Sequence, residues 1–204
     1  YAGRKIVLAT SIAETSLTIP DVRVVIDGGR SRRARFDAAS GMSLLVTERV
    51  TKAEAEQRRG RAGRVAAGLC YRLWAKGEEG GLAPYPPAEI EAADLTGLAL
   101  ELALWGGADG LSFLTPPNAG VLAEAQGLLE ALGALQGGRI TDHGRALAAL
   151  PLHPRLGHML LRSGGDQAAS LAALLAERDP IRAAPPDLAL RMAAIRDPRG
   201  FEAD

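Results

Sequence analysis

Residues 5–27 read KIVLATSIAETSLTIPDVRVVID, and this stretch decides the fold class. Lys5–Ala9 is a short, almost continuous apolar run, which is typical of a strand covered on both faces. Val22–Asp27 is a second apolar run, rich in β-branched residues. Ile12–Leu17 lies between them and is long enough for a short helix before Pro20. Two buried strands around a short crossover predict an α/β sheet that is mainly parallel.

The next segment predicts a β-hairpin followed by a helix and a strand. Arg32–Asp37 and Met42–Thr47 are strand-like runs that flank a Ser-Gly turn. Thr51–Arg64 lacks proline and is rich in Ala, Glu, Gln and Arg, with a threonine N-cap and Glu54 at the capping-box position. Leu69–Leu73 is apolar and closes this region as a further strand.

The composition changes after about residue 76. Lys76–Pro87 is rich in Gly, Glu and Pro, which predicts a linker. Beyond it, Leu-rich stretches between Pro or Gly stops predict a mainly helical region, with a small hairpin or wing at Gly137-Gly138. The expected helices are Ala93–Trp105, Pro116–Leu132, Asp142–Leu150 with a Thr141 cap, Pro154–Arg162, Asp166–Arg178 and Pro186–Arg196. The fold class is therefore α/β followed by mainly α.

Bulk composition is that of a globular protein: 204 residues, 47% hydrophobic and 24% charged, with zero formal net charge. Arginines crowd the first third and acidic residues the middle, which predicts a basic face on one domain; scattered solvated arginines are the alternative. The single cysteine, Cys70, excludes an internal disulfide and favours a reducing compartment. No stretch reaches the roughly 18 apolar residues of a membrane span. We expect a cytoplasmic protein, and the abrupt ends predict a fragment of a longer chain.

The octet Gln57–Arg64, QRRGRAGR, carries the strongest chemical signal. On a helix, positions 57, 61 and 64 share one face. The two glycines cost about 1 kcal/mol each against alanine, which close approach of another backbone or a phosphate would justify. Two guanidinium forks on one face suit a polyphosphate. The alternative is a basic helix that lies on nucleic acid or faces solvent.

This octet resembles motif VI, Q-R-x-G-R-x-G-R, of superfamily 2 helicases. Upstream, Ala9–Pro20 resembles motif V of the DEAH/RHA branch, and Val25–Gly29 resembles the strand that follows it. The resemblance implies a partial RecA-like parallel-sheet domain with a β-hairpin.

Similarity continues through the rest of the chain and weakens after about residue 165. Residues 94–135 are similar to the winged helix of DEAH helicases, with a Trp105-Gly106 pair like that of the bacterial HrpB subgroup. Leu147–Leu156 is similar to the entry into their helical-bundle (ratchet-like) domain. The implied domains are 1–76, the second RecA-like domain with motifs V and VI; 77–151, the winged helix; and 152–204, the start of the ratchet-like domain.

The resemblance assigns catalytic roles to residues of the octet. Arg61 and Arg64 match the motif VI arginines that reach the γ-phosphate, and arginine fingers are worth about 10³–10⁵ in rate. Gln57 matches the glutamine that helps to position the attacking water. Arg58 lies off that face and is interpreted as a structural or coupling residue.

Motif V carries the expected ligand contacts. Thr10 follows a predicted strand, where ligands bind in open α/β sheets, and the resemblance implies contact with an RNA phosphate. Ser16 and Thr18 match ATP-binding positions, with Thr18 on the ribose side; a helix cap or turn is the alternative for each. Ser11 stands where the family often has Asn, and Pro20 where some members have an acidic residue, so these contacts should weaken.

The hairpin matches one that DEAH helicases project towards nucleic acid. Arg32, Arg33 and Arg35 would attract phosphates without regard to base sequence, with ordinary edge-strand charges as the alternative. His143, His153 and His158 have no i, i+4 pair and are interpreted as satisfied histidines rather than metal ligands.

Together these features predict part of an ATP-dependent RNA helicase that uses ATP and Mg²⁺ between two RecA-like domains. The expected partners are a single strand of RNA, with DNA left open, and the first RecA-like domain of the same chain. A Gly-rich lysine loop and a D-E-A-H sequence occur nowhere in these residues, so the fragment alone should be inactive. The alternative is a non-enzymatic module that binds nucleic acid or protein.

Overall fold

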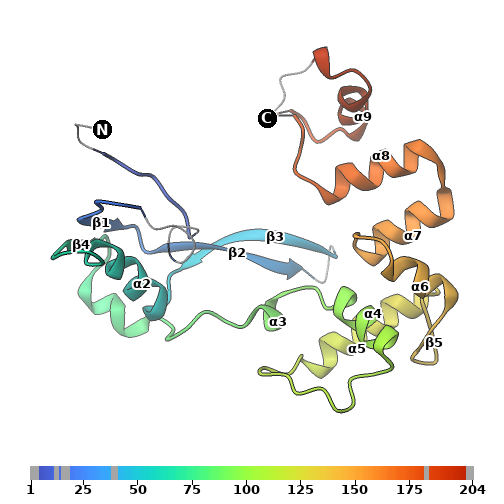
Figure 1. Cartoon of the computed structure of the whole chain (residues 1–204), viewed down its shortest axis with the longest axis horizontal. Coiled ribbons are helices and arrows are strands. Elements are labelled where there is room, and N and C mark those ends of the chain that lie inside the picture. Colours follow the sequence, from blue (N-terminus) through green and yellow to red (C-terminus); the bar gives the residue numbers. More distant parts are fainter. Residues whose placement is uncertain (1–4, 12–13, 15–18, 38–40, 182–183, 201–204) are drawn as a thin grey trace. The chain divides into compact units, whose positions relative to one another are not determined.

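The computed structural model describes residues 5–11, 14, 19–37, 41–181 and 184–200 (Figure 1). The chain divides into two compact units, Tyr1–Ala93 and Asp94–Asp204. The first combines a small parallel sheet, a hairpin and a helix, and the second is mainly helical, which confirms the predicted fold class. The division into three domains remains a prediction.

The parallel sheet of the first unit pairs β1 (Val24–Asp27) with β4 (Leu69–Arg72), so that Asp27 lies opposite Arg72. Parallel strands need a long crossover, and here it contains the hairpin and helix α2 (Lys52–Ala62), which contacts both strands. The predicted parallel arrangement is therefore present.

Lys5–Ala9 was expected to form a strand, and this prediction is wrong. The segment has no strand pairing, and Ile6 and Leu8 are 89% and 95% exposed. An apolar run becomes a strand only where neighbouring backbone satisfies its N–H and C=O groups. Among the described residues the sheet contains only β1 and β4. The helix expected at Ile12–Leu17 lies, except for Glu14, outside the described residues.

The hairpin consists of β2 (Arg30–Asp37) and β3 (Met42–Arg49), paired antiparallel with Arg30 opposite Arg49. It extends two residues further at its base than the sequence predicts. Glu48, in this added part, pairs across the strands with Arg33 and Arg35, so the extension joins opposite charges.

Helix α2 begins at the predicted capping box. The Thr51 hydroxyl accepts from Glu54 N at 3.3 Å, and the Glu54 carboxylate accepts from Thr51 N at 2.7 Å. The helix ends at Ala62, earlier than expected, because the chain turns there towards β4. A Cβ on Gly68 would lie 2.1 Å from the Ala62 carbonyl oxygen, so this turn requires glycine. Val50, Ala55 and Leu82 form the buried cluster beneath it, with Trp74 against it.

The predicted linker, Lys76–Pro87, contains the 3-10 helix η1 (Lys76–Gly81), and the short helix α3 (Glu89–Ala92) follows it. The second unit then follows the predicted order of elements, with the wing hairpin at residues 135–140 and with Leu129 and Leu147 buried in its core. Its elements are α4 (Thr96–Trp105), α5 (Ala119–Ala131), β5 (Leu135–Gln136), β6 (Arg139–Ile140), α6 (Asp142–Ala148), α7 (Pro154–Ser163), α8 (Gly165–Ala176), α9 (Leu188–Arg196) and η2 (Pro198–Gly200).

The predicted Thr141 cap is present, since its hydroxyl accepts from Gly144 N. Helix α5 begins three residues later than expected, and the Asn118 side chain caps it by accepting from Gly120 N. Searching the described residues for a helix both long and apolar enough to span a bilayer finds none.

Candidate functional site

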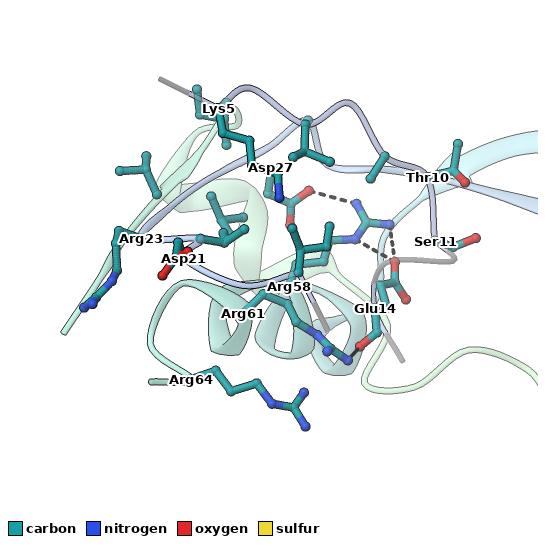
Figure 2. A pocket seen from close by; sticks show the side chains of 18 of the residues that line it. Lys5, Thr10, Ser11, Glu14, Asp21, Arg23, Asp27, Arg58, Arg61 and Arg64 are labelled. Carbon is teal, nitrogen blue, oxygen red and sulfur yellow. Dashed lines mark hydrogen bonds and ion pairs between the residues drawn. The ribbon is translucent and has the colours of Figure 1, made fainter. Parts of the chain in front are cut away.

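The first unit contains a cavity of about 650 Å³, bounded by β1, the segment that precedes it, the start of β2 and the end of α2 (Figure 2). Its charged lining is mainly basic, which suits an anionic ligand. The basic residues are Lys5, Arg23, Arg30, Arg32, Arg58, Arg61 and Arg64, and the acidic ones are Glu14, Asp21 and Asp27.

Arg58 lies at the centre of this lining, between two carboxylates (Figure 2). Its Nε donates to Glu14 Oε1 at 2.7 Å, and its Nη1 donates to Asp27 Oδ1 at 2.9 Å. Burial by itself would lower the pKa of Arg58, but the hydrogen bonds and charges of the two carboxylates outweigh it and raise this pKa. The guanidinium is therefore engaged by Glu14 and Asp27, and the structural or coupling role of Arg58 stays a prediction.

The two arginines predicted to reach a γ-phosphate both line this cavity. Arg61 is in the last turn of α2 and donates to the backbone carbonyl of Glu14. Arg64 is exposed and lies beyond the Gly63 C-cap, so the helical i+7 relation to Gln57 does not hold. Figure 2 shows its guanidinium apart from the Arg58 contacts. Gln57 is exposed on α2 and is not part of the cavity lining.

The motif V residues are only partly described. Thr10 is exposed and lines the cavity. Ser16 and Thr18, the predicted ATP-binding residues, lie outside the described residues. Thr10 therefore shares one cavity with Arg61 and Arg64.

The hairpin arginines divide between two faces, because successive strand residues point to opposite sides. Arg32 is exposed and lines the cavity. Arg33 pairs with Glu48 and Glu54, and Arg35 pairs with Glu48. Hydrogen bonds from Arg35, and then from Arg33, lower the pKa of Glu48. Arg33 and Arg35 are thus engaged by carboxylates of the first unit, which favours the alternative of edge-strand charges for these two, and Arg32 stays the candidate for phosphate contact.

The histidines lie in the second unit and contact protein groups. His143 Nε2 and His158 Nδ1 are 2.9 Å apart, and His153 Nε2 lies 2.7 Å from Asp94 Oδ2. In the described ranges, no three His, Cys, Asp or Glu side chains cluster so as to hold a metal ion.

Sequence reasoning missed Glu14 and Asp27, the two carboxylates that engage Arg58. Asp27 ends β1, and the carboxyl end of a parallel strand is where α/β sheets bind ligands, so its position was a usable signal. Glu14 carried no comparable signal, because its partners on α2 lie more than 40 positions away, 44 for Arg58 and 47 for Arg61.

Comparison with known proteins gives consistent matches. Residues 2–66 match the family described as the helicase conserved C-terminal domain. The chain is 45% identical over 175 residues to the ATP-dependent RNA helicase HrpB of Escherichia coli, covering 85% of this chain and 22% of the relative. It is 42% identical over 187 residues to the human ATP-dependent RNA helicase DHX29, covering 87% of this chain and 14% of the relative.

A solved structure agrees with these matches. The crystal structure of the E. coli DEAH/RHA helicase HrpB superposes with a TM-score of 0.82 at 41% identity, over 91% of this chain and 24% of that one. The chain thus spans less than a quarter of the length of these relatives. Sequence, fold and the octet on α2 agree, and the chain belongs to the DEAH/RHA helicase family as part of the C-terminal helicase region of the HrpB type.

Proposed function

We propose that this chain supplies one side of a split ATP site in an ATP-dependent RNA helicase. The observation that carries the proposal is the convergence of Arg61, Arg64 and Thr10 on one mainly basic cavity. Arg61 and Arg64 neutralise charge on the transferring phosphoryl group, and Gln57 on the same helix orients the attacking water. ATP and Mg²⁺ bind with the first RecA-like domain, which supplies the phosphate loop and the metal-binding acidic residues.

The open face of α2 supports a partner domain at this site. No described atom outside the local helix lies within 4 Å of a Cβ built on Gly60 or Gly63. Both glycines therefore leave room for another backbone or a phosphate. Only Gly60 lies in the helix interior, where glycine costs about 1 kcal/mol against alanine, because Gly63 is the C-cap. The first RecA-like domain of the same protein is the proposed occupant.

Thr10 and Arg32 are the proposed nucleic-acid contacts. Both are exposed and both line the cavity, and a hydroxyl and a guanidinium can each bind a backbone phosphate of single-stranded RNA. Such contacts carry no base specificity, so DNA is an alternative strand. We place this activity in the cytoplasm.

The test is Arg64→Ala in the complete helicase that contains this chain. ATP turnover should fall by about 10³-fold or more, the range for arginine fingers, because phosphoryl charge is left uncompensated. RNA affinity, measured by fluorescence anisotropy, should change little. Arg59→Ala is the matched control, since Arg59 is exposed on the same helix and pairs with Glu56. Near-normal turnover in Arg64→Ala would refute the finger assignment.

A non-enzymatic binding module remains a second candidate for residues 76–204 alone. Trp105 at the end of α4 is 78% exposed, and an exposed Trp is a frequent anchor in interfaces. Trp105→Ala in the complete protein would then weaken partner or strand binding without changing basal ATP turnover; a loss of basal turnover would argue against a separate module.

A further inference from the structure

Glu14 contacts two arginines of α2 through two different groups. Its carboxylate Oε1 accepts from Arg58 Nε at 2.7 Å and lies 2.6 Å from Arg58 Nη2. Its backbone carbonyl accepts from Arg61 (Figure 2). The contact between the Glu14 carboxylate and Arg58 therefore holds Glu14 in place. The carbonyl of Glu14 in turn orients Arg61, a proposed catalytic arginine.

Arg58 also joins this segment to the parallel sheet and to the hairpin. Its Nη1 donates to Asp27 Oδ1 at 2.9 Å, at the end of β1, and to the Arg30 carbonyl at 3.0 Å, at the start of β2. The Asp27 side chain is 0% exposed, and the Arg58 side chain is 16% exposed. One planar guanidinium thus connects three segments to α2, which a lysine ammonium cannot reproduce because it lacks the fork geometry.

A further hydrogen bond links Glu14 to the segment that carries Thr10, the proposed nucleic-acid contact. Glu14 N donates to the Ser11 carbonyl at 2.9 Å, and Thr10 directly precedes Ser11. A shift of Thr10 on strand binding would therefore move Glu14, and with it the carbonyl that Arg61 contacts.

We propose that Arg58 is a positioning residue that, through Glu14 and Asp27, couples strand binding at Thr10 to the placement of Arg61. This inference rests on the proposed function. Arg58 touches neither nucleotide nor nucleic acid in this scheme, and it acts through Glu14. Its removal should therefore affect stimulation of ATP turnover by RNA more than ATP or RNA binding.

The experiment compares Arg58→Lys and Glu14→Gln in the complete helicase. Glu14→Gln keeps the size of the side chain, and Arg58→Lys removes the guanidinium fork but keeps a positive charge beside the buried Asp27. We expect RNA-stimulated kcat to fall about tenfold, within the range for coupling residues, while the KM for ATP and the Kd for RNA change less than threefold. The ratio of stimulated to basal turnover should therefore fall in both variants.

Arg59→Lys is the matched control, because it is the same substitution on the next residue of α2 and affects only an exposed pair with Glu56. Its stimulation ratio should equal that of the wild type. Thermal unfolding of all variants tests for a merely structural role, which would lower Tm and reduce basal and stimulated turnover by the same factor.

Stimulation ratios equal to that of Arg59→Lys would overturn the positioning role, and so would equal losses of basal and stimulated turnover that disappear on cooling. A failure of the proposed function would give a different result. In that case Arg64→Ala would retain ATP turnover, regardless of the stimulation ratio measured for Arg58→Lys. If Arg64→Ala is inactive and Arg58→Lys behaves like its control, only the positioning role fails.

Discussion

At the scale of single residues, Glu54 connects the arginine-bearing helix to the hairpin. Its carboxylate accepts from Thr51 N and Oγ1 at 2.7 and 2.9 Å and from Ser31 Oγ at 3.1 Å, and it pairs with Arg33. Burial by itself would raise the pKa of Glu54, but the Thr51 hydrogen bonds and Arg33 outweigh it and bring this pKa below its ordinary value of 4.5. The side chain that caps α2 therefore also fixes its position against β2.

This depressed pKa predicts acid sensitivity. A carboxyl group whose pKa is lower when folded contributes stability above its unfolded pKa and loses it as pH falls through the folded pKa. We expect the free energy of unfolding to decline as pH falls below about 4.5, and to decline less in Glu54→Gln.

Glu54→Gln should also lower stability at pH 7 by about 1.5–3 kcal/mol, the range for hydrogen bonds to charged groups, although glutamine can keep the capping box. Urea unfolding at both pH values measures this. Glu56→Gln, which affects exposed pairs with Arg59 and Arg72, should cost about 1 kcal/mol or less. Equal effects of the two substitutions would contradict the role of Glu54.

At the scale of elements, the C-terminal end of α2 determines where its functional residues lie. The helix stops at Ala62, so Arg61 lies in the last turn and Arg64 in the following turn towards β4. Gly60 lies inside the helix with open space above it, whereas Gly68 lies against two carbonyl oxygens, those of Ala62 and Arg23. These two glycines should therefore respond to the same substitution in opposite ways.

Gly60→Ala should stabilise this chain by up to about 1 kcal/mol, because alanine is the better helix former and meets no atom there. In the complete helicase it should nevertheless lower ATP turnover, because the methyl group occupies the face proposed for the partner domain. Gly68→Ala, the control, should destabilise, since its Cβ would lie 2.1 Å from a carbonyl oxygen. Denaturant unfolding and ATPase assays separate the effects; unchanged turnover in Gly60→Ala would argue against a close partner.

At the scale of the whole chain, the proposed chemistry is incomplete. The 204 residues contain no phosphate-binding lysine loop and no D-E-A-H sequence, and the proposed γ-phosphate arginines face a cavity that this chain only partly encloses. Arginine fingers act on a nucleotide held by other residues, so they produce no turnover alone.

The purified 204-residue chain should therefore show no ATP turnover above a no-protein blank. Its affinity for single-stranded RNA should fall as salt rises, because phosphate contacts release counterions. Arg32→Ala should reduce the slope of log K against log salt by about 1. Measurable turnover by this chain, or salt-independent binding, would contradict these assignments.

The sequence by itself determined the succession of an α/β part and a helical part, the presence of a parallel sheet, the hairpin, the wing and the helix caps, but not which strands pair in the sheet. These features depend on periodicity and on hydrogen bonds between residues a few positions apart, such as Thr51 and Glu54. Tertiary structure alone decided that Arg58 meets Glu14 and Asp27, which lie 44 and 31 positions away. It also directed Arg32 into the cavity and Arg33 towards Glu48 and Glu54, and it left Lys5–Ala9 without a strand partner. Spacing along the chain carries no information on such contacts, because packing of whole elements brings these residues together.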